Sequence, residues 1–138
     1  LKGSFVFLSD LTKAVTVPCE IDFMAISTYG NESKSSGVVK ILKDLDRSIE
    51  GKDVLIVEDI VDSGITLKYL MSYLSSKGAS SVEIVTLLNK SARRAVNVNV
   101  KYISFEATDG FLVGYGLDYA EKYRNLPFIG ILKEEIYS

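Results

Sequence analysis

The chain has 138 residues, of which 47% are hydrophobic and 25% are charged, and we expect one globular domain over residues 1–138. The formal net charge of −2 argues against nucleic acid or an anionic membrane as the partner. Cys19 is the only cysteine and histidine is absent, which excludes an internal disulfide, a histidine zinc site and a Ser-His-Asp triad within this chain. A lone cysteine fits a reducing cytoplasm, and no apolar run approaches the roughly 18 residues that span a bilayer.

The first predicted element is a helix that begins after Ser4, a residue type favoured as an N-cap. The apolar face of this helix is predicted from helical spacing in residues 5–15. Its members are Phe5, Leu8, Thr12 and Val15.

Two strands separated by a loop follow. Residues 20–26, "EIDFMAI", and residues 38–42, "VVKIL", are rich in apolar side chains. Residues 27–37 between them are polar, small and without periodicity, which predicts a mobile loop. A connecting turn, "KDLDRSIEGK", completes this part of the chain.

The centre of the chain reads as strand, helix, strand. Residues 53–59, "DVLIVED", have a continuous apolar centre, as a strand covered on both faces does. The next apolar side chains recur at i, i+3, i+4 and i+7, and Gly78 supplies a helix stop. These side chains are Leu67, Leu70, Met71 and Leu74. Residues 82–88, "VEIVTLL", form the following strand.

Three shorter strands are predicted at residues 101–105, 111–116 and 128–132. Strands that alternate with helices favour a parallel sheet with right-handed crossovers. The sequence therefore predicts an α/β fold with a central, mainly parallel sheet flanked by helices.

The stretch "VLIVEDIVDSGITLKYL" places three carboxylates where a strand passes into a helix. Ligands of open parallel sheets bind at the carboxyl ends of the strands, and amide groups at a helix N-terminus bind phosphate. Glu58, Asp59 and Asp62 could then hold sugar hydroxyls or hydrated Mg²⁺, with a phosphate on the helix end. From spacing alone, simple helix capping is an equal alternative. The stretch is neither a Walker loop nor an EF-hand, because neither pattern is present.

This stretch resembles the ribose-phosphate loop of the type I phosphoribosyltransferases. Further segments resemble those of the hypoxanthine–guanine phosphoribosyltransferase family, bacterial branch, in the same order, over nearly the whole chain. These are "LKGS", "FMAISTYGNESKSSGVV", "LLNK", "FLVGYGLDYAEKYRNLPFIG" and "LKEEIY". The resemblance implies transfer of the phosphoribosyl group from 5-phosphoribosyl 1-diphosphate to a 6-oxopurine in purine salvage. It also implies a small hood over the base, formed partly by the C-terminal segment.

The resemblance assigns roles in the acidic loop. Glu58 and Asp59 would face the ribose hydroxyls, and Asp62 would lie near purine N7 as the general base. The residues that would hold the 5′-phosphate are Asp62, Ser63, Gly64, Ile65 and Thr66. A carboxylate near C1′ also suits the positive charge of an oxocarbenium-like transition state.

The resemblance also implies a pyrophosphate site and a metal site. Lys2, Gly3 and Arg124 would contact pyrophosphate, and the peptide bond between Leu1 and Lys2 would be cis. Mg²⁺ would be bound by Asp118 and, at a second position, by Glu58 and Asp59.

The purine would be recognised by residues of three segments. Lys90 would donate to the 6-oxo group, Phe111 would stack on the ring, and Leu112 would offer backbone groups, with Asp118 close by. Thr28 and Tyr29 would belong to a lid formed by residues 27–37 that excludes water.

The sequence departs from the family pattern in several places. The family has roughly 40 residues before "LKGS", which suggests that N-terminal material is missing. Asn89 stands where bacterial members usually have Asp, Thr28 replaces Ser, and "EATDGF" lacks a usual proline. An alternative is a regulatory module that binds the same ligand without turnover. The expected partners are the two small-molecule substrates and further copies of the chain, in a homodimer or homotetramer.

Overall fold

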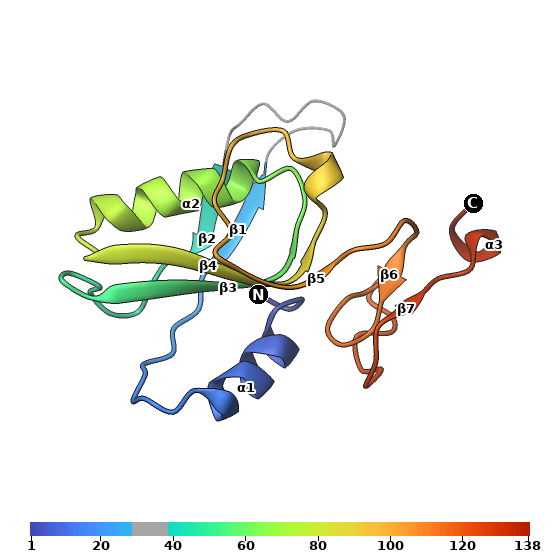
Figure 1. Cartoon of the computed structure of the whole chain (residues 1–138), viewed down its shortest axis with the longest axis horizontal. Helices are drawn as coiled ribbons and strands as arrows, with labels where there is room; N and C mark the ends of the chain where they lie inside the picture. The colour runs from blue at the N-terminus through green and yellow to red at the C-terminus, as the bar shows by residue number, and fades with distance from the viewer. Residues whose placement is uncertain (29–38) are drawn as a thin grey trace.

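The computed structural model describes residues 1–28 and 39–138, without the side chain of Thr28 (Figure 1). The helices and strands follow one another along the chain in an order that confirms the predicted α/β class. They are α1 (Phe5–Ala14), β1 (Ala25–Thr28), β2 (Val39–Lys43), β3 (Asp53–Val61), α2 (Ile65–Ser76), β4 (Ser81–Asn89), the 3₁₀ helix η1 (Ser91–Arg93), β5 (Tyr102–Glu106), β6 (Leu112–Val113), β7 (Gly130–Ile131) and α3 (Glu134–Tyr137).

The central sheet is parallel and has the strand order β3-β4-β5. Its middle strand, β4, is buried continuously from Ile84 to Asn89, whereas every residue of the edge strand β5 is exposed. The first strand, β3, is only partly covered, and its Leu55 is 44% exposed. The prediction that β3 is covered on both faces is therefore wrong for part of this strand.

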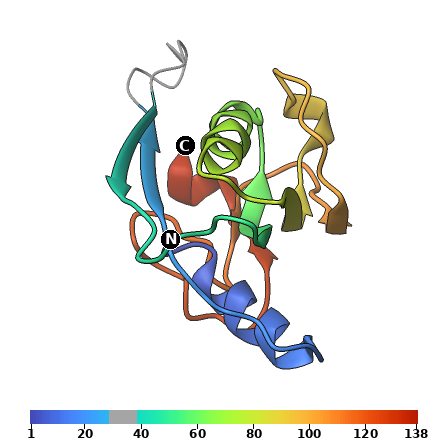
Figure 2. The same ribbon diagram turned by 90° about the vertical axis from the view of Figure 1, so that its left-hand side faces the viewer.

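Helices α1 and α2 lie on opposite faces of the sheet (Figures 1 and 2). Leu67, Leu70 and Leu74 of α2 are buried against Ile56 and Ile84 of the sheet, as the helical spacing predicted. Gly78 follows the helix with φ +89°, a left-handed conformation that glycine adopts without strain.

Helix α1 was predicted with the wrong buried face. Phe7 is buried with Val85 and Leu87 of the sheet, whereas Phe5 is 48% exposed and Val15 is 38% exposed. Ser4 occupies the N-cap position as predicted, but its side chain makes no capping hydrogen bond because its backbone is already in the right-handed helical region.

Strands β1 and β2 form a separate antiparallel ribbon (Figure 2). The strand predicted at residues 20–26 begins only at Ala25, because the Asp22 side chain before it is hydrogen-bonded to backbone amides of the loops. The Asp22 carboxylate accepts the backbone N–H of Phe23 and of Asp46, at 2.8 and 2.9 Å. Of the lid residues, Thr28 ends β1, while Tyr29 and most of residues 27–37 lie outside the described residues.

The C-terminal part forms what we call the hood, residues 111–138, beyond one end of the sheet (Figure 1). Its strands β6 and β7 pair antiparallel over two residues each. The longer strand predicted at residues 111–116 is wrong, because Gly114, Tyr115 and Gly116 have φ of +94°, +51° and +100° and turn the chain. Over residues 1–28 and 39–138, no helix is both long and apolar enough to cross a membrane.

Candidate active site

The turn from β3 into α2 consists of residues 62–64, since β3 ends at Val61 and α2 begins at Ile65. Gly64 has φ +84°, and a Cβ there would lie 2.8 Å from Val98 Cγ1. The Ser63 carbonyl accepts the backbone N–H of Ala95 at 2.9 Å. The turn is therefore fixed by the segment that follows β4. The first turn of α2 contains no acidic side chain, which leaves its N-terminal end suited to an anion.

A cavity of about 200 Å³ opens at this turn. Asp59 and Ile65, which were predicted for the same ligand, are not among its lining residues. The lining residues are Glu58, Ile60, Val61, Asp62, Ser63, Gly64, Thr66 and Leu67. A small cavity with two carboxylates, two hydroxyls and a helix N-terminus can bind a polyhydroxylated anion.

Glu58 and Asp59 are adjacent carboxylates that influence each other. Burial, and after it the neighbouring charge of Asp59, together raise the pKa of Glu58 from 4.5 to about 7. The Asp59 carboxylate accepts the backbone N–H of Ile60 at 2.8 Å. A cation beside this pair would relieve the repulsion between the two carboxylates.

The residues present fit Mg²⁺ at Glu58 and Asp59, because Mg²⁺ commonly takes one or two protein carboxylates and fills its remaining positions with phosphate and water. Among the described residues, no three acidic, cysteine or histidine side chains form one metal-binding group. Asp118 instead lies 3.4 Å from Arg124 Nη2 and accepts the Glu121 backbone N–H at 2.9 Å.

Lys2 and Gly3 lie against the end of the sheet. A Cβ on Gly3 would be 2.1 Å from Asp59 Oδ2, and a Cβ on Gly116 would be 2.4 Å from the Gly3 carbonyl oxygen. Three segments distant in sequence therefore meet here, and neither glycine has room for a side chain. The cis peptide predicted between Leu1 and Lys2 is absent. The trans form is the lower-energy form of a non-proline bond.

Arg124 is anchored beside these glycines. Its Nη1 donates to the Gly116 carbonyl at 2.8 Å, and its Nη2 lies 3.3 Å from Glu121 Oε1. Lys2 Nζ lies 3.6 Å from Glu121 Oε2. The two cations predicted to bind pyrophosphate thus converge on a single carboxylate.

Lys90 follows β4, directly beside the β3–α2 turn. Its backbone N–H donates to the Val61 carbonyl at 2.9 Å, so the ends of the two strands hold Lys90 and Asp62 next to each other. Arg93 Nε lies 3.2 Å from Asp62 Oδ1. The geometry of this ion pair is not that of a hydrogen bond, and Oδ1 has no hydrogen-bond partner among the described residues.

Phe111 and Leu112 occupy the start of the hood. Phe111 is 39% exposed, and its ring packs edge-on against Tyr119, with the centroids 5.5 Å apart, and at a tilt against Tyr137 at 5.4 Å. Leu112 packs in the cluster that contains Leu88 of β4. Within the described parts of the chain, no hydrogen bond, ion pair or ring contact joins either residue to Lys90 or Asp62.

Asn89 has a structural reason to be an amide. It is 4% exposed, its Nδ2 donates to Glu106 Oε1 at 2.7 Å, and its Oδ1 accepts from Arg94. An ionised aspartate could accept from Arg94 but could not donate to Glu106.

Sequence reasoning noticed Asn89 as a departure but missed its partners, and it missed Arg93 and Glu121 altogether. The three-residue spacing of Glu121 and Arg124 was the one available signal.

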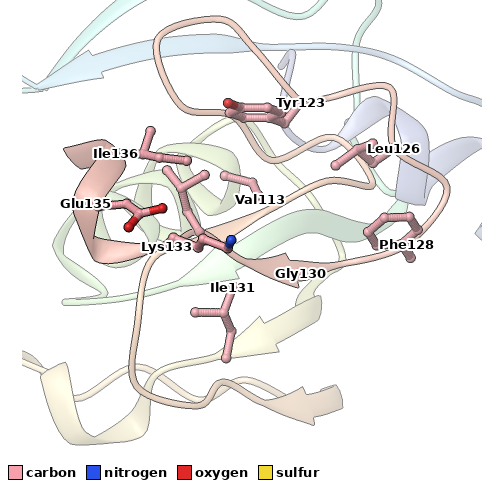
Figure 3. Close-up of a pocket in the computed structure, with 10 residues that line it drawn as sticks. Val113, Tyr123, Leu126, Phe128, Gly130, Ile131, Lys133, Glu135 and Ile136 are labelled. Atoms are coloured by element: carbon pink, nitrogen blue, oxygen red, sulfur yellow. The ribbon is translucent and has the colours of Figure 1, made fainter.

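A second, more apolar cavity of about 350 Å³ lies within the hood (Figure 3). Figure 3 shows Tyr123, Leu126 and Phe128 on one side of it and Ile136 on the other. None of the predicted site residues lines this cavity, so it is not the candidate active site.

The comparisons with known proteins agree with the parallel sheet and its acidic turn. Residues 1–120 match the profile of the phosphoribosyl transferase domain. The chain is 53% identical over 137 residues to a Bacillus subtilis hypoxanthine-guanine phosphoribosyltransferase, covering 99% of this chain and 76% of that protein. It is 56% identical over 138 residues to the bifunctional protein TilS/HprT of Listeria monocytogenes, but spans only 21% of that longer protein.

Among solved structures, a Staphylococcus aureus hypoxanthine phosphoribosyltransferase superposes with a TM-score of 0.96 at 53% identity, covering 100% of this chain and 75% of that chain. The fold is therefore that of a type I phosphoribosyltransferase. Within that class, the chain belongs to the hypoxanthine-guanine phosphoribosyltransferase family.

Proposed function

We propose that this chain transfers the phosphoribosyl group from 5-phosphoribosyl 1-diphosphate to hypoxanthine or guanine, giving the nucleoside monophosphate and pyrophosphate. The observation that carries the proposal is the cavity at the β3–α2 turn. It combines Asp62 and Glu58 with a helix N-terminus, in a chain 53% identical to a hypoxanthine-guanine phosphoribosyltransferase.

In this proposal the 5′-phosphate binds the turn and the start of α2. Gly64 brings backbone amides close to the ligand, and the hydroxyls of Ser63 and Thr66 add hydrogen bonds. Glu58 and Asp59 accept hydrogen bonds from the ribose hydroxyls. The adjacent fixed charges leave little need for reorganisation when positive charge develops at C1′.

Asp62 is the general base of the proposed reaction. As C1′ separates from the diphosphate and bonds to purine N9, the proton at N7 must leave, and the Asp62 carboxylate accepts it. Support comes from its position beside Lys90, which would hold the purine 6-oxo group. Phe111 and Leu112 would complete the base site when the hood lies over it, with Asp118 nearby.

The diphosphate binds Lys2, Gly3 and Arg124 in this proposal. One Mg²⁺ would be held by Asp118 and a second by Glu58 and Asp59, and both would neutralise phosphate charge when bound. Thr28 and Tyr29 are proposed lid residues.

We further propose one catalytic domain over residues 1–138 that acts in the cytoplasm as a homodimer or homotetramer. Light scattering after size-exclusion chromatography tests the number of subunits, and a monomer at micromolar concentration would contradict this part of the proposal.

The activity is tested by incubating the protein with 5-phosphoribosyl 1-diphosphate, Mg²⁺ and each of hypoxanthine, guanine, xanthine and adenine. We expect nucleotide from hypoxanthine and guanine and little or none from adenine. If the protein binds the donor by calorimetry but forms no nucleotide with any base, the alternative of a binding module without turnover is correct and the proposed enzyme function is wrong.

A further inference from the structure

Glu121 holds both cations of the proposed pyrophosphate site. Its Oε1 lies 3.3 Å from Arg124 Nη2, its Oε2 lies 3.4 Å from Arg124 Nε, and Oε2 also lies 3.6 Å from Lys2 Nζ. Among the described residues, Glu121 is the only acid paired with both of them. A carboxylate paired with a guanidinium and an ammonium uses the same charged donors that can bind a phosphate group.

The backbone around Glu121 is held in an uncommon conformation. Ala120, Glu121 and Tyr123 have φ of +50°, +64° and +80°, which non-glycine residues rarely adopt. The Glu121 backbone N–H donates to Asp118 Oδ2 at 2.9 Å, and Tyr119 and Lys122 exchange backbone hydrogen bonds at 3.0 and 2.9 Å. Such conformations persist where surrounding contacts impose them, commonly at functional sites.

The strength of each contact differs with exposure. The side chains of Glu121 and Lys2 are 64% and 71% exposed, whereas that of Arg124 is 22% exposed and is also anchored on the Gly116 carbonyl. Exposed ion pairs are weak and are screened by salt. A ligand with several negative charges can therefore displace the Glu121 side chain while Arg124 stays in place.

We propose that Glu121 is an internal competitor of the diphosphate: it neutralises Lys2 and Arg124 in the free protein and releases both when pyrophosphate or the donor binds. This inference rests on the proposed function, because it takes Lys2 and Arg124 as the pyrophosphate ligands. Glu121 thereby weakens the hold of the site on pyrophosphate, the product that must leave after each turnover.

The test is calorimetric titration of inorganic pyrophosphate, with Mg²⁺ in excess, into the wild-type chain and into variants. Glu121→Gln should bind pyrophosphate about 3- to 10-fold more tightly, the range expected for removing two exposed ion pairs. Glu121→Asp should also bind more tightly although its charge is unchanged, because the shorter side chain reaches the two cations less well. The matched control is Glu50→Gln, which removes the same charge at an exposed position beside Gly78 and should leave the affinity unchanged.

Arg124→Gln separates the two proposals. If it weakens pyrophosphate binding while Glu121→Gln and Glu121→Asp leave it unchanged, the pyrophosphate site stands and the competitor role of Glu121 is overturned. Equal tightening by Glu121→Gln and Glu50→Gln would also overturn it, since net charge alone would then explain the gain. If neither Arg124→Gln nor Lys2→Gln changes the affinity, the pyrophosphate site itself is wrong, and the role of Glu121 falls with it.

Discussion

At the scale of single residues, the candidate active site brings together residues that directly follow two neighbouring parallel strands. The Lys90 N–H donates to the Val61 carbonyl, and this one backbone hydrogen bond sets an acid, Asp62, beside a donor, Lys90. The two have complementary chemistry, because a carboxylate accepts a proton and an ammonium group can only donate. Their roles can therefore be separated by substitutions that keep size and change only hydrogen-bonding capacity.

Asp62→Asn should keep the fold and donor binding but slow the chemical step by about 10²-fold or more, since an amide cannot take the N7 proton. Single-turnover kinetics with guanine, combined with calorimetric titration of the donor, measure the two effects separately. A variant with near-normal turnover would mean that water or another group removes the proton.

Lys90→Gln should reduce the preference for 6-oxopurines over adenine. Lysine only donates, so it meets the 6-amino group of adenine donor to donor, at a cost of about 1–3 kcal/mol or roughly 10- to 100-fold in selectivity. Glutamine both donates and accepts, so the gap should narrow mainly through a lower kcat/KM for hypoxanthine and guanine. Wild-type protein that used adenine as well as guanine would contradict the assignment of Lys90.

Residue types were predictable from the sequence, but their partners were not. Glu58, Asp59 and Asp62 stand out in the sequence because three acidic residues just before a helix indicate either a ligand site or helix capping. By contrast, Arg93 reaches Asp62, and Lys2 reaches Glu121, only after the chain has folded. Contacts between side chains so far apart in sequence leave no periodic pattern, so no local rule finds them.

At the scale of elements, a side-chain hydrogen bond joins the hood to α1. The Tyr115 hydroxyl donates to Asp10, and this bond is the main reason that the pKa of Tyr115 is raised to about 12. The hydroxyl is therefore protonated, and the bond intact, throughout the neutral range. Tyr115 has φ +51°, so this contact lies in the turn that shapes the hood.

Tyr115→Phe should lower the free energy of unfolding by about 0.5–1.5 kcal/mol, the usual worth of one hydrogen bond, while the ring keeps its packing. Urea unfolding measures this, with Tyr119→Phe as the control because its hydroxyl makes only a long 3.4 Å bond to the Ile136 carbonyl. In an Asp10→Asn background the effect of Tyr115→Phe should shrink; an undiminished effect would show that the bond to Asp10 is not its cause.

Helices and strands with a clear hydrophobic pattern were predicted well, whereas those whose ends or faces depend on tertiary contacts were not. β3, α2 and β4 were found because long apolar runs and i, i+3, i+4 spacing are dictated by burial. The start of β1 was misplaced because Asp22 bonds loop amides. The face of α1 was misplaced because Phe7, and not Phe5, meets the sheet. Both outcomes depend on tertiary neighbours that a local pattern does not contain.

At the scale of the whole molecule, the ligand site and the stability of the fold are coupled through Glu58. Its pKa is 4.5 when unfolded and about 7 when folded, chiefly because of burial. The folded state thus favours the protonated carboxyl, and this favourable contribution is lost as pH rises from about 4.5 through about 7. Above pH 7, Glu58 is a buried, ionised carboxylate beside Asp59 in the free protein, and a bound cation would stabilise it.

Glu58→Gln should therefore stabilise the free protein more at pH 8 than at pH 5, by at most about 3 kcal/mol and less where solvent reaches the carboxylate. Thermal or urea unfolding at the two pH values measures the difference, with Glu50→Gln as the matched control. Mg²⁺ with pyrophosphate should reduce the pH dependence of the wild type. Parallel stability curves for Glu58→Gln and wild type would rule out Glu58 as the source.

The buried middle strand β4 has a consequence for the order in which parts of the protein open. Its amides bond both neighbours and are shielded from Ile84 to Asn89, so they should exchange with deuterium only on global unfolding. The two-residue pairing of β6 with β7 offers far less resistance and should exchange through local opening. Lys90 directly follows the strand expected to exchange most slowly, whereas Phe111 and Arg124 belong to the hood, which we expect to open locally. The contact of Lys90 with the purine 6-oxo group would then stay in place while the other base and pyrophosphate contacts form and break with the hood.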